Sequence, residues 1–154
     1  MPDFLGRLPF RWHLWIAARM LPPIAARGPL ERLLGFATPG GATPAYASLS
    51  VSEILTAVKN VSARPWVMRE QRCLREGLLA FRFLALAGYR PVLHFGVAPE
   101  TAKSNHPRAH CWISLDGKAI FNPPTEPMLN LLSYNGQEAI PASGSSPDFE
   151  VADV

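Results

Sequence analysis

The hydrophobic period of the chain changes once, at Gly88, and this change constrains the fold more than any other feature. Before it, residues 73–88 carry apolar side chains at the spacing of a largely buried helix. The main apolar stripe of this segment consists of Leu74, Leu78, Phe81 and Ala85. After it, residues 91–97, 108–115 and 118–121 have the composition of short strands. Helices followed by antiparallel strands predict an α+β domain.

Prolines and caps divide the segment that precedes residue 73. We expect helices over residues 9–21, over residues 29–34, and from Ser50 or Ser52 to residue 61. Pro22-Pro23 should end the first helix or kink it sharply. Residues 37–47 have the composition of a flexible linker.

The 154 residues are enough for one domain with a buried core. We predict an N-terminal helical segment with its linker over residues 1–47 and a core over residues 48–141. Residues 142–154 should form a flexible acidic tail. Within the core, residues 128–134 fit a short helix or a strand.

The charge distribution excludes some functions. Residues 1–72 carry 9 Lys/Arg and 4 Asp/Glu, and residues 73–154 carry 6 and 8, so their net charges are +5 and −2. This bias is too weak and scattered to predict nucleic-acid binding. The apolar stretch over residues 8–26 contains Arg11, Arg19 and Pro22-Pro23, which argues against a membrane span. Peripheral contact of this helix with a membrane surface, or docking on a partner, stays open.

Two cysteines, Cys73 and Cys111, are too few for a disulfide framework. A bridge between them is one alternative. No signal-peptide pattern precedes them, because Arg7 and Arg11 interrupt the apolar N-terminal stretch, so we favour a cytoplasmic protein with two thiols. A zinc site built from both cysteines with His106 and His110 would lack paired Cys-x-x-Cys units, and we expect neither a metal nor a cofactor.

Cys73 and His110 are the best candidates for chemistry. The N-terminus of a helix favours the thiolate form of a cysteine located there. A histidine on a strand can serve as the base that removes the thiol proton. Asp116 lies about 20 Å along the strand from His110 at about 3.3 Å per residue, too far to orient the imidazole. Asn122, on the returning strand, is the remaining candidate for that role.

The hairpin type decides whether Asn122 can reach His110. A three-residue loop over residues 115–117 pairs Ser114 with Lys118 and therefore places Asn122 opposite His110. A two-residue Asp116-Gly117 loop pairs Cys111 with Asn122 instead. A Cys73–His110–Asn122 triad needs the first hairpin, in which Cys111 is an inert core thiol on the opposite face.

The other histidines and the N-terminal aromatic residues favour structural roles. We expect His94 to be a structural residue or a pocket wall, and His13 and His106 to lie on the surface. Phe10, Trp12 and Trp15 should belong to the core face of their helix, with docking of a partner as the alternative.

Residues 64–124 carry three motifs of one family. They are Cys73-Leu74 near a helix start, the Gly-Tyr-Arg-Pro-Val segment that follows, and the strand AHCWISLDGKAIFNPP from Ala109. These motifs resemble the transglutaminase-like, papain-like leader peptidases of lasso-peptide biosynthesis, which typically show Cys-Leu-x-Arg-Ser, Gly-Val and Ala-His-Ala-Trp-Val-Glu. The basic, aromatic N-terminal segment is similar to that of stand-alone members.

The resemblance implies a central Cys-bearing helix packed on a small antiparallel sheet, with Cys73 as nucleophile and His110 as base. The third residue of the family, usually Asp, falls on Asn122, and Asn can also orient a histidine. This chain departs from the family at other positions too. Glu76-Gly77 stands for Arg-Ser, Cys111 for Ala, and Ser114 for Glu.

The implied function is a cysteine endopeptidase that removes the leader from a ribosomally made lasso-peptide precursor. The core peptide would then be free for ATP-dependent macrocyclisation by a separate lasso cyclase. A separate leader-binding recognition protein is implied as well. The alternatives are a non-catalytic peptide-binding or scaffolding module of the same type of pathway, and acyl transfer to an amine in place of water.

Overall fold

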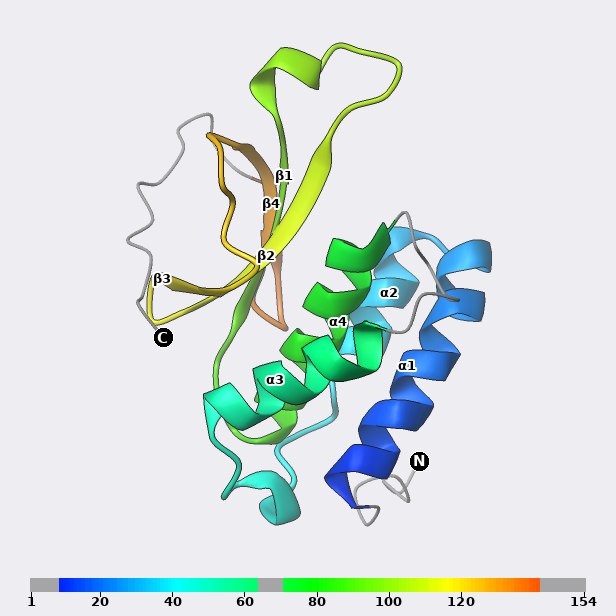
Figure 1. Cartoon of the computed structure of the whole chain (residues 1–154), viewed down its shortest axis with the longest axis vertical. Helices are drawn as coiled ribbons and strands as arrows, with labels where there is room; N and C mark the ends of the chain where they lie inside the picture. Colours follow the sequence, from blue (N-terminus) through cyan, green and yellow to red (C-terminus); the bar gives the residue numbers. More distant parts are fainter. Residues whose placement is uncertain (1–8, 64–70, 142–154) are drawn as a thin grey trace. The chain divides into compact units, whose positions relative to one another are not determined.

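The computed structural model describes residues 9–63 and 71–141 and divides the chain into two compact units (Figure 1). The helical unit comprises residues 1–89, and the sheet unit comprises residues 90–154. The helices of the first are α1 (Phe10–Arg27), α2 (Leu30–Ala37), α3 (Val51–Ser62) and α4 (Arg72–Leu86). The divisions predicted after residues 47 and 141 stay predictions, and the tail lies outside the described residues.

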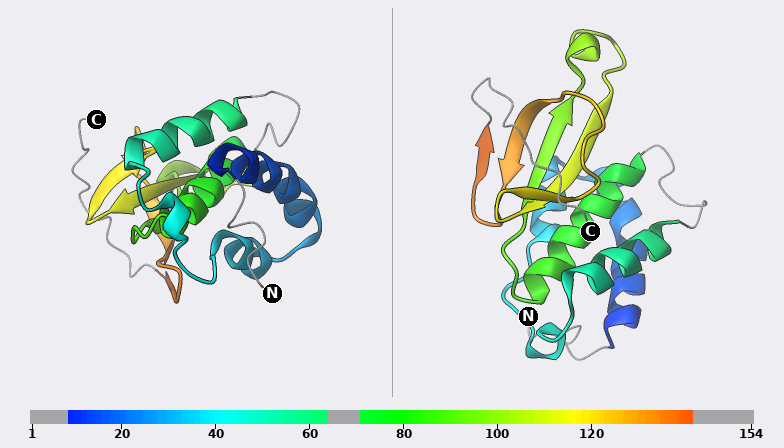
Figure 2. Two further views of the ribbon diagram at one scale, coloured as in Figure 1. Left: turned by 90° about the horizontal axis from the view of Figure 1, so that it is seen from below. Right: turned by 60° about the vertical axis from the view of Figure 1, so that its left-hand side comes forward.

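Helix α4 is the centre of the helical unit. The other three helices all lie against it (Figure 2). Its residues are buried almost without interruption from Arg75 to Leu84. The helix ends as the sequence predicts, because Gly88 takes a φ of +92° that favours glycine. The Tyr89 N–H then donates to the Leu84 carbonyl over 3.0 Å, a bond typical of a Schellman cap. The apolar period of residues 73–88 therefore predicted this helix correctly.

Helix α1 differs from the prediction, because it continues through Pro22-Pro23 to Arg27. Two backbone N–H groups are missing there, yet Leu14, Ala18 and Leu21 are buried along one side and hold the helix by packing. Pro23 itself is exposed. The expected end of α1 at residue 21 is thus wrong.

Helices α2 and α3 begin where the sequence places them. Pro29 precedes α2, which ends at Ala37, three residues beyond the prediction. Ser50, one of the two candidate caps, begins α3 through a capping box with Glu53. The Glu53 N–H donates to the Ser50 hydroxyl over 3.2 Å, and the Glu53 carboxylate accepts from the Ser50 N–H over 2.8 Å.

The segment predicted as a flexible linker is tied to the helices. Tyr46, in the 3₁₀ turn η2 (Pro44–Tyr46), is only 2% exposed, and its hydroxyl lies 2.9 Å from His13 Nδ1. The Thr43 N–H donates to the Leu86 carbonyl. His13 is buried beside Phe83, so its expected position on the surface is wrong. The prediction failed because this tertiary contact cannot be inferred from local sequence.

The outer face of α1 carries two tryptophans. Phe10 packs on Tyr46 and Phe83, as expected for a core residue. Trp12 is 60% exposed and Trp15 is 37% exposed, so their assignment to the core face is wrong. The alternative, docking of a partner on these residues, stays a prediction.

The sheet unit contains one antiparallel sheet, with the strand order β3-β2-β1-β4-β5 (Figures 1 and 2). Its strands are β1 (Val92–Val97), β2 (Ala109–Leu115), β3 (Lys118–Phe121), β4 (Leu129–Tyr134) and β5 (Ala139–Pro141). Residues 128–134, left open between helix and strand, include β4. Helices followed by an antiparallel sheet confirm the α+β class.

The β2–β3 hairpin has the two-residue loop. Asp116 and Gly117 take φ values of 51° and 80°, as in a type I′ turn, and Leu115 pairs with Lys118. A register shift follows, so that Ile113 pairs with Phe121. The three-residue loop that the triad required is therefore wrong, because the Asp-Gly pair adopts the tighter turn.

Candidate active site

Cys73 is the second residue of α4, whose N-cap is Gln71. Its side chain is partly exposed, and neither Cys73 nor Cys111 takes part in a disulfide. The first turn of a helix has backbone N–H groups without intrahelical partners and the positive end of the dipole. Both favour a thiolate over a thiol at Cys73.

Charged side chains surround this first turn. Arg72 Nε donates to Glu76 Oε1 over 2.8 Å, and Glu76 is almost fully buried. Arg75 is buried too and donates weakly to the Val61 carbonyl at 3.4 Å. Burial lowers the pKa of Arg75, while the Glu76 carboxylate opposes this shift. The family departure at Glu76 thus places a carboxylate one turn from Cys73, and Arg72 pairs with it.

His110 lies on β2 and is half-buried. Its Nε2 atom is 2.8 Å from the main-chain oxygen of Asn122. A carbonyl can only accept, so Nε2 must carry a hydrogen. In the neutral form of this ring, Nδ1 has the lone pair that a general base needs.

Asn122 meets His110 in a way that the sequence did not predict. The contact uses its main-chain carbonyl, whereas we expected the side-chain carboxamide to face the imidazole. Asn122 follows the last residue of β3 with a φ of 48°, in the left-handed region that Asn tolerates better than most residues. This local turn brings the two residues together although the strand register does not pair them.

The model of the transglutaminase-like superfamily matches residues 4–129 of the sequence. The chain belongs to this superfamily. Its fold is accordingly a transglutaminase-like, papain-like α+β fold, and the superfamily includes cysteine peptidases. No curated protein and no solved structure gives a significant match.

In this transglutaminase-like chain, the candidate residues fall in both units. Cys73 belongs to the helical unit, whereas His110 and Asn122 belong to the sheet unit. Cys111 is buried and lies next to His110 on β2, so its side chain points to the opposite face of the sheet. This orientation agrees with a core thiol.

Sequence reasoning missed two residues that contact the aromatic side chains next to His110 on the sheet. Ser133 on β4 and Gly96 on β1 gave no local signal, because their importance depends on which side chains lie across the sheet. Ser133 Oγ is 2.8 Å from His94 Nδ1, and Ser114 Oγ, at the position of the usual Glu, is 2.7 Å from His94 Nε2. His94 is therefore a structural residue, as one of the two sequence interpretations predicted.

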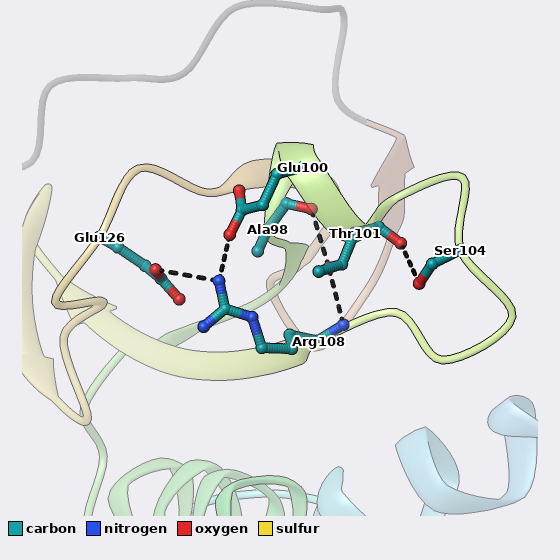
Figure 3. A network of polar contacts seen from close by, with 6 residues as sticks. All are labelled: Ala98, Glu100, Thr101, Ser104, Arg108 and Glu126. Atoms are coloured by element: carbon teal, nitrogen blue, oxygen red, sulfur yellow. Dashed lines mark hydrogen bonds and ion pairs between the residues drawn. The ribbon is translucent and has the colours of Figure 1, made fainter.

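A network of ion pairs is centred on Arg108, which lies two residues before His110 in the sequence (Figure 3). Arg108 pairs with Glu100 of the 3₁₀ turn η4 (Pro99–Thr101) and, at 3.3 Å, with Glu126. Its backbone N–H donates to Thr101 Oγ1 over 2.9 Å. Each exposed pair adds little stability, but together they connect the β1–β2 loop, which leads to His110, with the loop between β3 and β4.

The described residues offer no metal site. Among residues 9–63 and 71–141, no group of three or more His, Cys, Asp and Glu side chains is placed to hold an ion. His106 lies exposed in the β1–β2 loop, as the sequence predicts. None of the helices in these two ranges has the length and apolar character of a membrane-spanning segment.

Proposed function

We propose that this protein is a cysteine endopeptidase that removes the leader from a ribosomally made lasso-peptide precursor. Three observations support the proposal. They are the superfamily match, the position of Cys73 at the head of α4, and the resemblance of the motifs in residues 64–124 to the leader peptidases.

The bond between His110 and Asn122 carries the chemical part of the proposal. With Nε2 donating to the Asn122 carbonyl, Nδ1 accepts the proton of the Cys73 thiol. The thiolate attacks the carbonyl carbon between leader and core, and N–H groups of the first turn of α4 stabilise the oxyanion. His110 gives its proton to the leaving amine of the core. Water, activated by the same imidazole, then releases the leader from Cys73.

The proposal includes two protein partners, a separate leader-binding protein and the lasso cyclase. The exposed face of α1 is the surface where we expect the first to dock, because Trp and Arg dominate binding hot spots. Arg19 stacks on Trp15 at 4.1 Å, and a cavity of about 250 Å³, large enough for a side chain, adjoins Trp15. The residues that line it are Arg11, Leu14, Trp15, Ala57, Asn60 and Val61.

A pull-down with the leader-binding protein tests this surface. Trp12→Ala/Trp15→Ala should lose the complex, and Leu131→Ala, an exposed apolar residue of the sheet unit, should keep it. If the double variant binds normally, the docking surface lies elsewhere. Co-sedimentation of the protein with anionic vesicles, lost in the double variant, would instead assign α1 to a membrane surface.

Mass spectrometry of precursor, leader-binding protein and this protein tests the activity. We expect free leader and free core with the wild type, none with Cys73→Ala, and normal cleavage with Cys111→Ala as the matched control. Cleavage by Cys73→Ala would disprove the assignment of the nucleophile. A wild type that binds the precursor but leaves it intact, with all partners present, would favour the non-catalytic module. Leader joined to an added amine would identify acyl transfer.

A further inference from the structure

Three aromatic rings lie nearly parallel on one face of the sheet. The Trp112 indole stacks on His94 with centroids 5.3 Å apart and planes at 15°. It also stacks on His110, at 6.3 Å and 18°. Trp112 is fully buried, so the indole is a fixed surface against which the His110 imidazole rests.

His94 is held at both ring nitrogens. One serine hydroxyl, that of Ser133 or Ser114, accepts from the N–H of the neutral imidazole, and the other donates to its lone pair. His94 is 6% exposed, and burial lowers its pKa to about 4. The ring therefore stays neutral near pH 7 and cannot rotate without breaking a buried hydrogen bond.

Gly96 leaves room for the Trp112 indole because it has no side chain. A β-carbon at this position would lie 2.8 Å from Trp112 Cζ3 and 3.1 Å from the Leu129 carbonyl oxygen. The first approach is closer than van der Waals contact allows and the second is tight, so a β-carbon here would displace the indole from its place across β1. Gly96 pairs with His110 in the β1–β2 register, which places this close approach directly beside the imidazole.

We infer that His94 is a positioning residue: fixed by Ser114 and Ser133, it holds the Trp112 indole against His110 and so sets the orientation of the base. The role of His110 as base rests on the proposed function, but the geometric claim about its ring does not. His94 itself touches neither the thiol nor the scissile bond in this account.

Imidazole NMR of the full chain tests the geometric claim without substrate. Long-range ¹H–¹⁵N spectra of ¹⁵N-histidine protein should show His110 as the Nε2–H tautomer. His94→Ala should convert this signal to a mixture of tautomers, and His94→Phe, which keeps a flat ring under the indole, should preserve it. His106→Ala, which removes an exposed imidazole of the same unit, should leave it unchanged.

An unchanged His110 signal in folded His94→Ala would overturn the inference. Dispersed amide signals from β1 and β2 report whether the sheet unit, which contains His94 and His110, remains folded. If His94→Ala does not fold, Gly96→Ala displaces the same indole from the other side. It should produce the same mixture of His110 tautomers, and an unchanged signal would again overturn the inference.

Cleavage kinetics separate the two proposals. His94→Ala should lower kcat/KM for the precursor about tenfold, mostly through kcat, and His94→Phe should restore it to within about threefold. A wild type that shows the expected tautomers but cleaves nothing would reject the peptidase and keep the positioning role. A wild type that cleaves, with equal rates for His94→Ala and His94→Phe, would reject the positioning role alone.

Discussion

The surroundings of Cys73 and of His110 differ in kind. Cys73 begins a helix among charged side chains, with the Arg72–Glu76 ion pair and buried Arg75 nearby. His110 contacts a main-chain carbonyl and a buried indole, which are both uncharged. From this difference we expect charge to govern the reactivity of the Cys73 thiol, and packing and backbone conformation to govern the orientation of the His110 ring. Substitutions near His110 should therefore alter packing and the orientation of its ring, whereas substitutions near Cys73 should alter the reactivity of the thiol.

The largest effect should come from overpacking beside His110. Gly96→Ala forces the Trp112 indole to move, because the new β-carbon would lie 2.8 Å from it. We expect a loss of about 1–3 kcal/mol in the free energy of unfolding, measured by urea titration. Gly35→Ala is the matched control, since a β-carbon there meets nothing within 4 Å. It should stabilise α2 by up to about 1 kcal/mol. Equal stability of both variants would contradict the role given to Gly96.

The backbone of Asn122 should matter more than its side chain. Asn122→Gly keeps the left-handed conformation and the carbonyl, so cleavage should stay within about threefold of the wild type. Asn122→Val, whose branched side chain disfavours a positive φ, should lose at least about tenfold. Asn122→Asp should change the rate but preserve activity. Equally large losses in Asn122→Gly and Asn122→Val, neither of which has a carboxamide, would show that the carboxamide orients His110.

We expect a smaller effect from removing a charge near Cys73. Glu76→Gln removes a negative charge one helical turn from Cys73, which favours the thiolate because a like charge no longer opposes it. Alkylation of Cys73 by iodoacetamide at pH 7 should become about two- to fivefold faster, as measured by peptide mass spectrometry. Glu31→Gln, in the exposed first turn of α2, should not change the rate. Slower alkylation of Cys73 in Glu76→Gln would contradict the claim that the Glu76 charge opposes the thiolate.

Local patterns predicted the parts of the molecule that local physics determines. The helix after Cys73, a cap at Ser50 or Ser52 and a hairpin at Asp116-Gly117 all follow from residues within a few positions of one another, although the choice between the two caps and between the two loop lengths did not. The burial of His13 and the passage of α1 through Pro22-Pro23 depend on packing between helices, which no short window of sequence contains.

The candidate site shows the same limit. Asn122 was linked to His110 by a hairpin register that does not form, and the two residues meet through a carbonyl because Asn122 turns into the left-handed region. The support from His94 and Gly96 was missed, since it depends on which residues face each other across β1 and β2. Sequence thus proposed the residues, but the structure was needed to show how two of them interact.

The central claim is that His110 activates Cys73, and thiol reactivity tests it without any substrate. Alkylation of both cysteines by iodoacetamide, followed by mass spectrometry between pH 5 and 9, compares the wild type with His110→Ala. We predict fast modification of Cys73 at pH 7 in the wild type, a rate about tenfold lower in His110→Ala, and slow modification of buried Cys111 in both. The same pH profile for Cys73 in the two proteins would contradict the account.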